Sequence, residues 1–494
     1  MPCLALVRCG AALGATLGAA SLAAQPADPS PVPPAEYAAH RDSLAARLGD
    51  GVLLAFGGRA PVTNFGPFHQ LPAFRWLVDY RDADAALVMT VRGGRHETFL
   101  FTTPIGARQA FYDGARPDSA TVARTTGVRV RSIGALDAVL DSLLGGASML
   151  WTLSDFEASD FAGQDSLTRG QSYVRALAAR RPGLTVRDAH PFVYQLRARK
   201  SDAELALIRR AAEISAAGHL AAMRLPTPTR EYELQAAVEY EFMRRGGARP
   251  AYGSIVGGGI RGTQLHYMRN RGALAPGDLV VIDAATEYEG YAADVTRTIP
   301  IGGTFSPDAR RLYQIVLDAQ LAAERNSKVG MSAIAALDSS ESVRARGLLE
   351  LGLIESLDAQ LDMPWRTDCT ASPRSCRQSM FWMIHGISHG LGLEVHDPAQ
   401  FYGGDRTFKV GDAFVIEPGL YVSEQMLDAL PDTPRNRRFI ERVRPAVRRF
   451  QGMGVRIEDA YIVTGRGVER VSTAAPRTVE EIERAMRSAR PPLP

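Results

Sequence analysis

Four carboxylates placed in apolar, strand-like segments constrain this chain of 494 residues more than any other feature. Asp283 and Asp294 lie in VVIDAATEYEGYAADVTRTIPI, Glu417 in DAFVIEPGLYV and Glu458 in GVRIEDAYIV. Burying a carboxylate is costly unless it pairs with a cation or binds a metal ion. We therefore expect a fold that brings these strands together around a shared partner.

Residues 280–301 read as a β-hairpin, because apolar and β-branched residues flank a polar turn. A turn centred between Tyr288 and Glu289 sets Asp283 directly opposite Asp294. Opposed side chains on paired strands have Cβ atoms ~5 Å apart. Two carboxylates at that distance need a cation or a shared proton between them.

Histidines recur downstream in MIHGISHGLGLEVHD, residues 383–397. His385 and His389 are four residues apart, which would suit one helix face, but the glycines favour irregular backbone. Taken singly, a lone histidine such as His389 or an inward Asp is more often structural. Taken together, the carboxylate oxygens and a histidine nitrogen suit one or two divalent transition-metal ions.

The chain divides into two domains. Residues 36–195 alternate between helix and strand patterns and predict a smaller α/β domain with no identifiable chemistry. Ser201 and Glu204 form a capping box that opens the second domain's first helix. Over residues 196–485, helix pairs flanking a highly curved antiparallel sheet predict an α+β fold. We expect strand and loop from Phe381 onward, then a terminal helix at EEIERAMRSA and a tail, 486–494.

The N-terminus has the form of a secretory signal peptide. Residues 1–24 carry one basic residue, a 14-residue apolar run and small residues at the end. Residues 25–35 follow as a Pro-rich linker. We expect a bacterial protein exported to the periplasm or the medium, with no integral membrane segment after cleavage. A disordered Ala-rich leader is the alternative.

Two cysteines remain once this leader is removed. Cys369 and Cys376 lie in the polar segment TDCTASPRSCRQ. An isolated pair in an oxidising compartment predicts a local disulfide. A zinc site is the weaker alternative, because the spacing is unusual and no second pair exists.

The charge pattern gives no reason to expect a nucleic-acid partner. The formal net charge is only +3, and 54 of the 57 basic residues are arginine, which is a uniform compositional bias. The densest arginine run, from Arg435 to Arg449, is better explained as a solvated face.

The order of the acidic and histidine positions resembles the M24 "pita-bread" metallopeptidases. The contexts VIDA, ADVTRT, SHGLGLEVHD, VIEPGLY and VRIEDA are most similar to the proline-specific branch, aminopeptidase P and prolidase. The resemblance covers residues 197–485, whereas residues 36–195 resemble the family's creatinase-like N-terminal domain only weakly. It implies a pita-bread catalytic domain behind a smaller α/β domain.

The resemblance also implies a role for each position. Asp283 would bind one metal ion, Asp294 and Glu458 would bridge two, and His389 and Glu417 would hold the second. The implied ions are two divalent cations, usually Mn(II), with Co, Zn or Fe also suited to these ligands.

Further roles concern the substrate. Glu417 would carry a proton from water to the leaving amine, and His385 and His396 would assist catalysis by hydrogen bonding to the substrate carbonyl and the oxyanion. His266 would line the same pocket. Arg456 would orient the last carboxylate or hold a substrate carboxylate.

The resemblance thus implies an exopeptidase that acts on short peptides, and it also implies a dimer or tetramer, as members of the family often form. Release of the N-terminal residue before proline is the leading expectation. A prolidase-type dipeptidase or a carboxypeptidase remains open, because the segment HDPAQFYGG and two long insertions differ from the family pattern near the substrate. A metal-free, non-catalytic peptide-binding module is the remote alternative.

Overall fold

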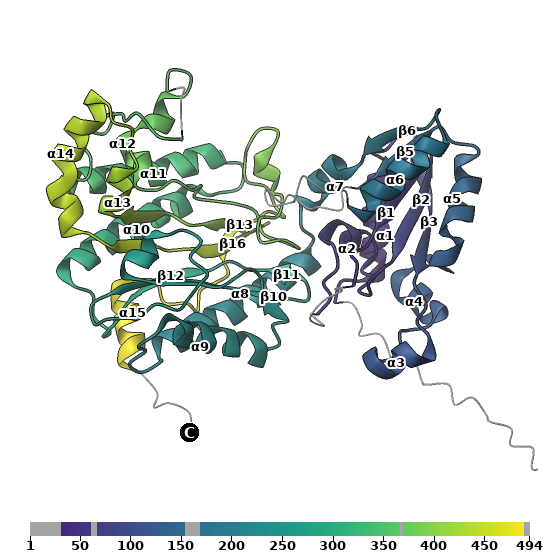
Figure 1. The fold of residues 1–494 in the computed structure, drawn as a ribbon, viewed down its shortest axis with the longest axis horizontal. Coiled ribbons are helices and arrows are strands. Elements are labelled where there is room, and N and C mark those ends of the chain that lie inside the picture. The colour runs from purple at the N-terminus through teal and green to yellow at the C-terminus, as the bar shows by residue number, and fades with distance from the viewer. Residues whose placement is uncertain (1–30, 61–66, 154–167, 366–368, 489–494) are drawn as a thin grey trace, which may run out of the picture.

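The computed structural model describes residues 31–60, 67–153, 168–365 and 369–488. The expected signal peptide, most of the linker 25–35 and the end of the tail 486–494 lie outside these ranges. Two bodies lie side by side, with α7 at their junction (Figure 1). Within the described ranges no helix has the length and apolar character needed to cross a membrane.

The first body is a mixed six-stranded sheet covered by helices on both faces (Figure 1). The strand order is β4-β3-β2-β1-β5-β6. The strands are β1 (Gly51–Phe56), β2 (Ala86–Arg92), β3 (Arg95–Thr102), β4 (Arg129–Ser132), β5 (Met149–Thr152) and β6 (Thr185–Asp188). The helices are α1 (Pro34–Ala45), α2 (Pro72–Val78), α3 (Ala107–Asp113), α4 (Ser119–Thr126), α5 (Leu136–Leu144), α6 (Arg169–Arg180) and α7 (His190–Arg197).

The central strands of this sheet are apolar throughout because both faces are covered. Successive residues of β1 enter different cores: Leu53 packs with Leu87 on one face, and Leu54 packs with Val88 on the other. This body is the expected α/β domain.

The second body is an α+β domain, as the sequence predicts. Its helices are α8 (Asp202–Met223), α9 (Glu231–Arg244), α10 (Pro307–Asn326), α11 (Ala333–Glu350), α12 (Gln378–Phe381), α13 (Glu424–Asp428), α14 (Pro434–Arg449) and α15 (Val479–Arg487). Its strands are β7 (Arg249–Pro250), β8 (Ile255–Gly258), β9 (Leu279–Asp283), β10 (Thr286–Tyr288), β11 (Tyr291–Ala292), β12 (Thr296–Pro300), β13 (Ala413–Ile416), β14 (Gly419–Val422), β15 (Met453–Arg456), β16 (Asp459–Thr464) and β17 (Gly467–Arg470).

Antiparallel pairing brings the two halves of this domain together. β12 pairs with β9 and β9 with β8, while β13 pairs with β16 and β14 with β15. An antiparallel bridge between Thr296 and Glu458 joins the earlier group of strands to the later one. The capping box of Ser201 and Glu204 begins α8 as expected.

The expectation of only strand and loop between residue 381 and the terminal helix is wrong. α14 spans 16 residues, capped by Thr433, and it buries Phe439, Val443 and Val447. These apolar residues recur every four positions, which is the period of a helix face. The surrounding arginines and an internal proline obscure this period in the sequence. The arginines of α14 lie on its solvated side, as expected, with Arg448 67% exposed.

Cys369 and Cys376 are joined by a disulfide, with their Cα atoms 5.7 Å apart. The bond closes the polar loop that precedes the histidine segment.

Candidate metal centre

The hairpin forms, but with a register that differs from the expected one by two residues. Asp283 pairs with Thr296 rather than with Asp294. The turn is centred between Glu289 and Gly290, which both have positive φ, 49° and 84°. This conformation matches the right-handed twist of a two-residue hairpin. A two-residue shift keeps the side-chain face, so both aspartates still point the same way.

Backbone pairing places His389 beside Glu417. The amides of Val415 and Glu417 donate to the carbonyl oxygens of His389 and Ile387, at 3.0 and 2.9 Å. The segment containing His389 therefore extends the sheet along β13, and it carries no helix. The irregular, glycine-rich backbone expected from the sequence is confirmed.

Glu458 joins the cluster through its pairing with Thr296. Its amide donates to the carbonyl of Thr296 at 3.0 Å, and the Thr296 hydroxyl donates to its Oε2 at 2.8 Å. Thr296 lies two residues beyond Asp294, so this pairing brings the two carboxylates to one centre. Asp294, His389 and Glu458 each offer one ligand atom, and these three atoms lie within 4.8 Å of one another.

The imidazole of His389 is oriented as a metal ligand is. Its Nδ1 lies 3.1 Å from the carbonyl oxygen of Gly390, which can only accept, so Nδ1 carries the proton. Its Nε2 lone pair faces carboxylate oxygens of Asp294, Glu417 and Glu458 at 3.5, 3.7 and 3.8 Å. Metal-binding histidines typically donate their second nitrogen to a carbonyl in this way.

The electrostatics of the cluster favour a cation. Oε1 of Glu458 is buried and has no hydrogen-bond partner among the described residues. Burial, and then neighbouring carboxylates, raise the pKa values of Asp294 and Glu458 well above their ordinary values. Buried acids with converging, unsatisfied oxygens suit divalent ions. The donor set therefore fits the expected metal ions.

Asp283 is tied to the cluster by two neighbours. The Tyr252 hydroxyl donates to Asp283 Oδ1 at 2.5 Å and also contacts Asp294 Oδ1. Nη2 of Arg456 donates to Asp283 Oδ2 at 2.5 Å, and its Nε donates to the Thr296 hydroxyl at 3.3 Å. Arg456 is only 4% exposed, so its guanidinium serves the carboxylates of the centre.

Glu417 differs from the other acids. Burial alone would raise its pKa, but the adjacent His385 and Arg456 lower it. Nδ1 of His385 lies 3.4 Å from Glu417 Oε2. Glu417 is therefore ionised at neutral pH and can accept a proton.

The remaining candidate histidines are His385, His396 and His266. Nε2 of His385 lies 2.8 Å from the Tyr421 hydroxyl, which accepts from Arg456 Nη1 at 2.9 Å. The ring of His396 lies 4.2 Å from that of His389. His266 is exposed.

Three hydroxyl residues of the centre are absent from the sequence-based candidates: Tyr252, Tyr421 and Thr296. Each one hydrogen-bonds a candidate residue, yet none carries a charge that would attract attention in an apolar strand. The nearest sequence signal is alternation, because Thr296 shares a strand face with Asp294.

Comparisons with known proteins identify the family of this chain. Residues 206–465 match the model of metallopeptidase family M24, and residues 37–151 match that of the aminopeptidase P N-terminal domain. The chain is 29% identical to a Xaa-Pro aminopeptidase of Escherichia coli (strain K12), covering 92% of this chain and 98% of that enzyme. It is 31% identical to the Xaa-Pro aminopeptidase of Haemophilus influenzae, covering 85% and 89%.

Solved structures agree as well. Aminopeptidase P from E. coli with the inhibitor Pro-Leu superposes with a TM-score of 0.77 at 28% identity, covering 92% of this chain and 99% of that one. A zinc-substituted form of that enzyme in complex with product gives a TM-score of 0.76. The family model spans more than half of the chain, and the relatives align over nearly their full length. The chain therefore belongs to metallopeptidase family M24 and is a metal-dependent hydrolase.

Proposed function

We propose that this protein is an exported Xaa-Pro aminopeptidase with a two-metal centre. One observation carries the proposal: a histidine lone pair and three carboxylate oxygens converge on one point. Asp283 joins them through Tyr252. The full-length similarity to enzymes named Xaa-Pro aminopeptidase supports the substrate class.

The five candidate ligands suit two divalent ions, and we propose Mn(II). Asp283, Asp294 and Glu458 would hold one ion, and Asp294, His389, Glu417 and Glu458 the other. When bound, such ions polarise a peptide carbonyl and lower the pKa of water towards ~7. Oxygen-rich ligation with a single imidazole also admits Co, Zn or Fe.

The side chains around the ions would move and hold the reacting groups. Glu417 has a lowered pKa and is ionised at neutral pH, so it can take a proton from the attacking water and pass it to the leaving amine. His385 and His396 flank the centre and can donate hydrogen bonds to the substrate carbonyl and to the oxyanion. Such a donor is often worth ~3 kcal/mol of transition-state stabilisation.

The candidates for substrate contacts differ in how exposed their side chains are. His266 and His396 are exposed, so a peptide can reach both. Arg456 is buried against Asp283, so we assign it to orienting the carboxylates rather than to binding a substrate carboxylate.

Export and assembly extend the proposal. The signal-like residues 1–24 and the Cys369–Cys376 disulfide both suit the periplasm or the medium. N-terminal sequencing of the mature protein tests the cleavage near residue 24. We further propose a homodimer or homotetramer, which light scattering tests.

Product analysis tests the activity. The Mn(II)-loaded mature protein is incubated with peptides that have proline second, with dipeptides ending in proline, and with proline-free controls. Mass spectrometry is expected to show loss of one N-terminal residue before proline. Cleavage of dipeptides alone would indicate a prolidase-type enzyme, and loss of C-terminal residues a carboxypeptidase. No cleavage with any divalent ion would refute the proposal and favour a binding module.

A further inference from the structure

We propose that Asp397, clamped by Arg197 and Lys200, positions His396 and so makes the segment between the two domains part of the active site. The role of His396 in this inference rests on the proposed function. Asp397 follows His396 directly, and both cations come from the stretch where α7 ends and α8 has not yet begun.

The loop that carries His396 is closed at its base by Asp397. The amide of Asp397 donates to the carbonyl of Gly390 at 3.1 Å, so the loop leaves and rejoins the sheet at neighbouring points. His389 stands at one end of the loop and His396 at the other, with ring centroids 4.2 Å apart. A shift of Asp397 would therefore move His396 relative to His389.

Both oxygens of Asp397 are held by cations from outside the loop. Arg197 Nη2 donates to Oδ1, and it also donates to Glu394 Oε2 at 2.8 Å. Lys200 Nζ lies 2.9 Å from Oδ2 and donates to the carbonyl of Pro398 at 2.5 Å. The clamp thus fixes both residues that follow His396.

This clamp is buried throughout. Asp397, Arg197 and Lys200 are 1%, 2% and 3% exposed. A buried ion pair adds little net stability over well-packed apolar residues. What the clamp adds is orientation, because its hydrogen bonds hold the carboxylate from two directions.

Gly392 leaves space in the loop for the carboxylate of Asp397. A Cβ at Gly392 would lie 2.3 Å from Asp397 Oδ2 and 3.0 Å from Lys200 Cε. The glycine therefore lets the loop backbone close onto the clamp.

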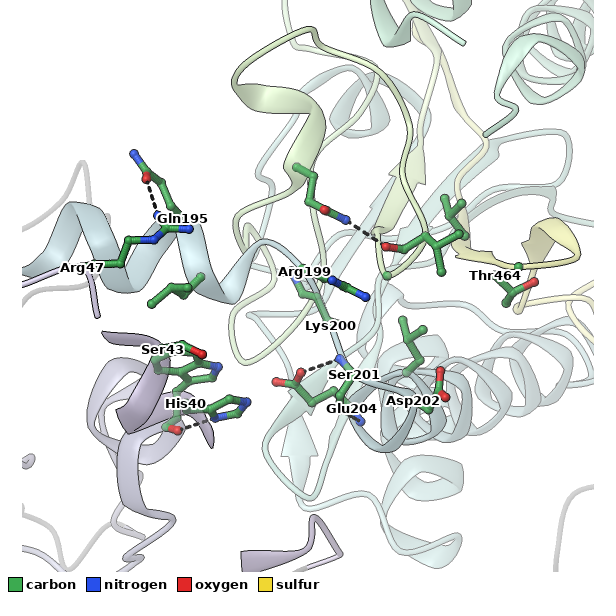
Figure 2. A pocket seen from close by; sticks show the side chains of 18 residues that line it. His40, Ser43, Arg47, Gln195, Arg199, Lys200, Ser201, Asp202, Glu204 and Thr464 are labelled. Atoms are coloured by element: carbon green, nitrogen blue, oxygen red, sulfur yellow. Dashed lines mark hydrogen bonds between the residues drawn. The ribbon is translucent and has the colours of Figure 1, made fainter. Parts of the chain in front are cut away.

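The segment that supplies the clamp also connects the domains. Figure 2 shows residues 199–202 along the wall of a cavity of about 670 Å³ between α1 and the second domain. The amide of Lys200 donates to the carbonyl of Gly411 at 2.8 Å, which anchors the segment to the catalytic domain. A change in the angle between the domains would move Arg197, and with it Asp397 and His396.

The test removes one cation and leaves the carboxylate paired. In Lys200→Met the aliphatic stem is kept, and Asp397 retains Arg197 and the amide of Glu394. Metal content and unfolding temperature are measured first. The matched control is Lys409→Met, which removes a half-exposed lysine paired with Asp405. We expect kcat/KM to fall about 10- to 100-fold in Lys200→Met with its metal retained, and by less than about twofold in the control.

A double-mutant cycle separates positioning from general destabilisation. If Lys200 acts through His396, adding Lys200→Met to His396→Ala costs less than about twofold in kcat/KM. Equal losses in both backgrounds, or full activity of Lys200→Met, would overturn the inference. Failure of the wild-type protein to cleave any peptide would instead count against the proposed function.

A crystal structure of Lys200→Met tests the geometry without relying on turnover. We expect the centroids of His389 and His396 to separate by about 1 Å or more relative to wild type, a misplacement large enough to impair catalysis. Rings that keep the wild-type separation of 4.2 Å would overturn the inference.

Discussion

Replacing Tyr252 by phenylalanine removes one oxygen from the middle of the metal centre. The hydroxyl donates to Asp283 Oδ1 at 2.5 Å and also contacts Asp294 Oδ1, so one group orients both aspartates. Phenylalanine keeps the ring and its packing, and no other described side chain bonds to both carboxylates. The substitution therefore tests the orientation of the ligands rather than the fold.

The size of the expected effect follows from the energy of a hydrogen bond to a carboxylate. A hydrogen bond to a charged group is worth about 1.5–3 kcal/mol. At about 1.4 kcal/mol per factor of ten, its loss corresponds to roughly a 10- to 150-fold change in an equilibrium constant. Removal of partners that orient metal ligands typically costs about 10- to 100-fold in metal affinity, which is the same range.

Chelator competition with Mn(II) measures this affinity. Tyr252→Phe is expected to raise the Kd for the metal by about 10- to 100-fold. Tyr240→Phe is the matched control, because Tyr240 is 54% exposed on α9, and its Kd should stay within about twofold of wild type. A Kd for Tyr252→Phe within about twofold of wild type would refute the idea that this hydroxyl organises the two aspartates.

Three further perturbations test other parts of the account. Glu417→Gln should lower kcat by about 10²- to 10⁴-fold at saturating Mn(II), because the amide cannot accept a proton; a loss below tenfold would contradict this role. In metal-free protein, Asp294 and Glu458 have higher pKa values in the folded state than in the unfolded chain. Their contribution to stability is therefore fully present only below their ordinary pKa values near ~4, and it is lost as these acids ionise. Thermal unfolding should therefore show stability falling as pH rises from there, less steeply in Asp294→Asn, and equal slopes in the two proteins would be inconsistent with coupled acids. Cys369→Ser should destabilise the protein by about 2–3 kcal/mol through loop entropy without changing its metal content, whereas identical unfolding of oxidised and reduced protein would argue against the staple.

The chemistry of the site is more predictable from the sequence than its geometry is. A carboxylate is costly to bury, so one in an apolar strand indicates a function. The sequence alone therefore identifies Asp283, Asp294, Glu417 and Glu458 as candidates. Their convergence depends on the bridge between Thr296 and Glu458, which joins residues 162 positions apart and leaves no local signal.

The structure differs from the sequence-based expectation where one local conformation decides a larger pattern. The hairpin register depends on which residues take positive φ, and Glu289 does so alongside Gly290 although it is not a typical residue for that region. In α14, arginines and Pro445 hide the apolar period, so the sequence does not predict this helix. The sequence does not point to Tyr252, because a tyrosine beside a glycine carries no charge pattern.

The central claim is that five side chains hold two ions, and anomalous scattering tests it most directly. Crystals of the Mn(II)-loaded protein are measured on both sides of the manganese absorption edge. We predict two anomalous peaks roughly 3.5–4 Å apart, with Asp294 and Glu458 between them, Asp283 at one and His389 and Glu417 at the other. One peak, or peaks away from these residues, would contradict the two-metal centre.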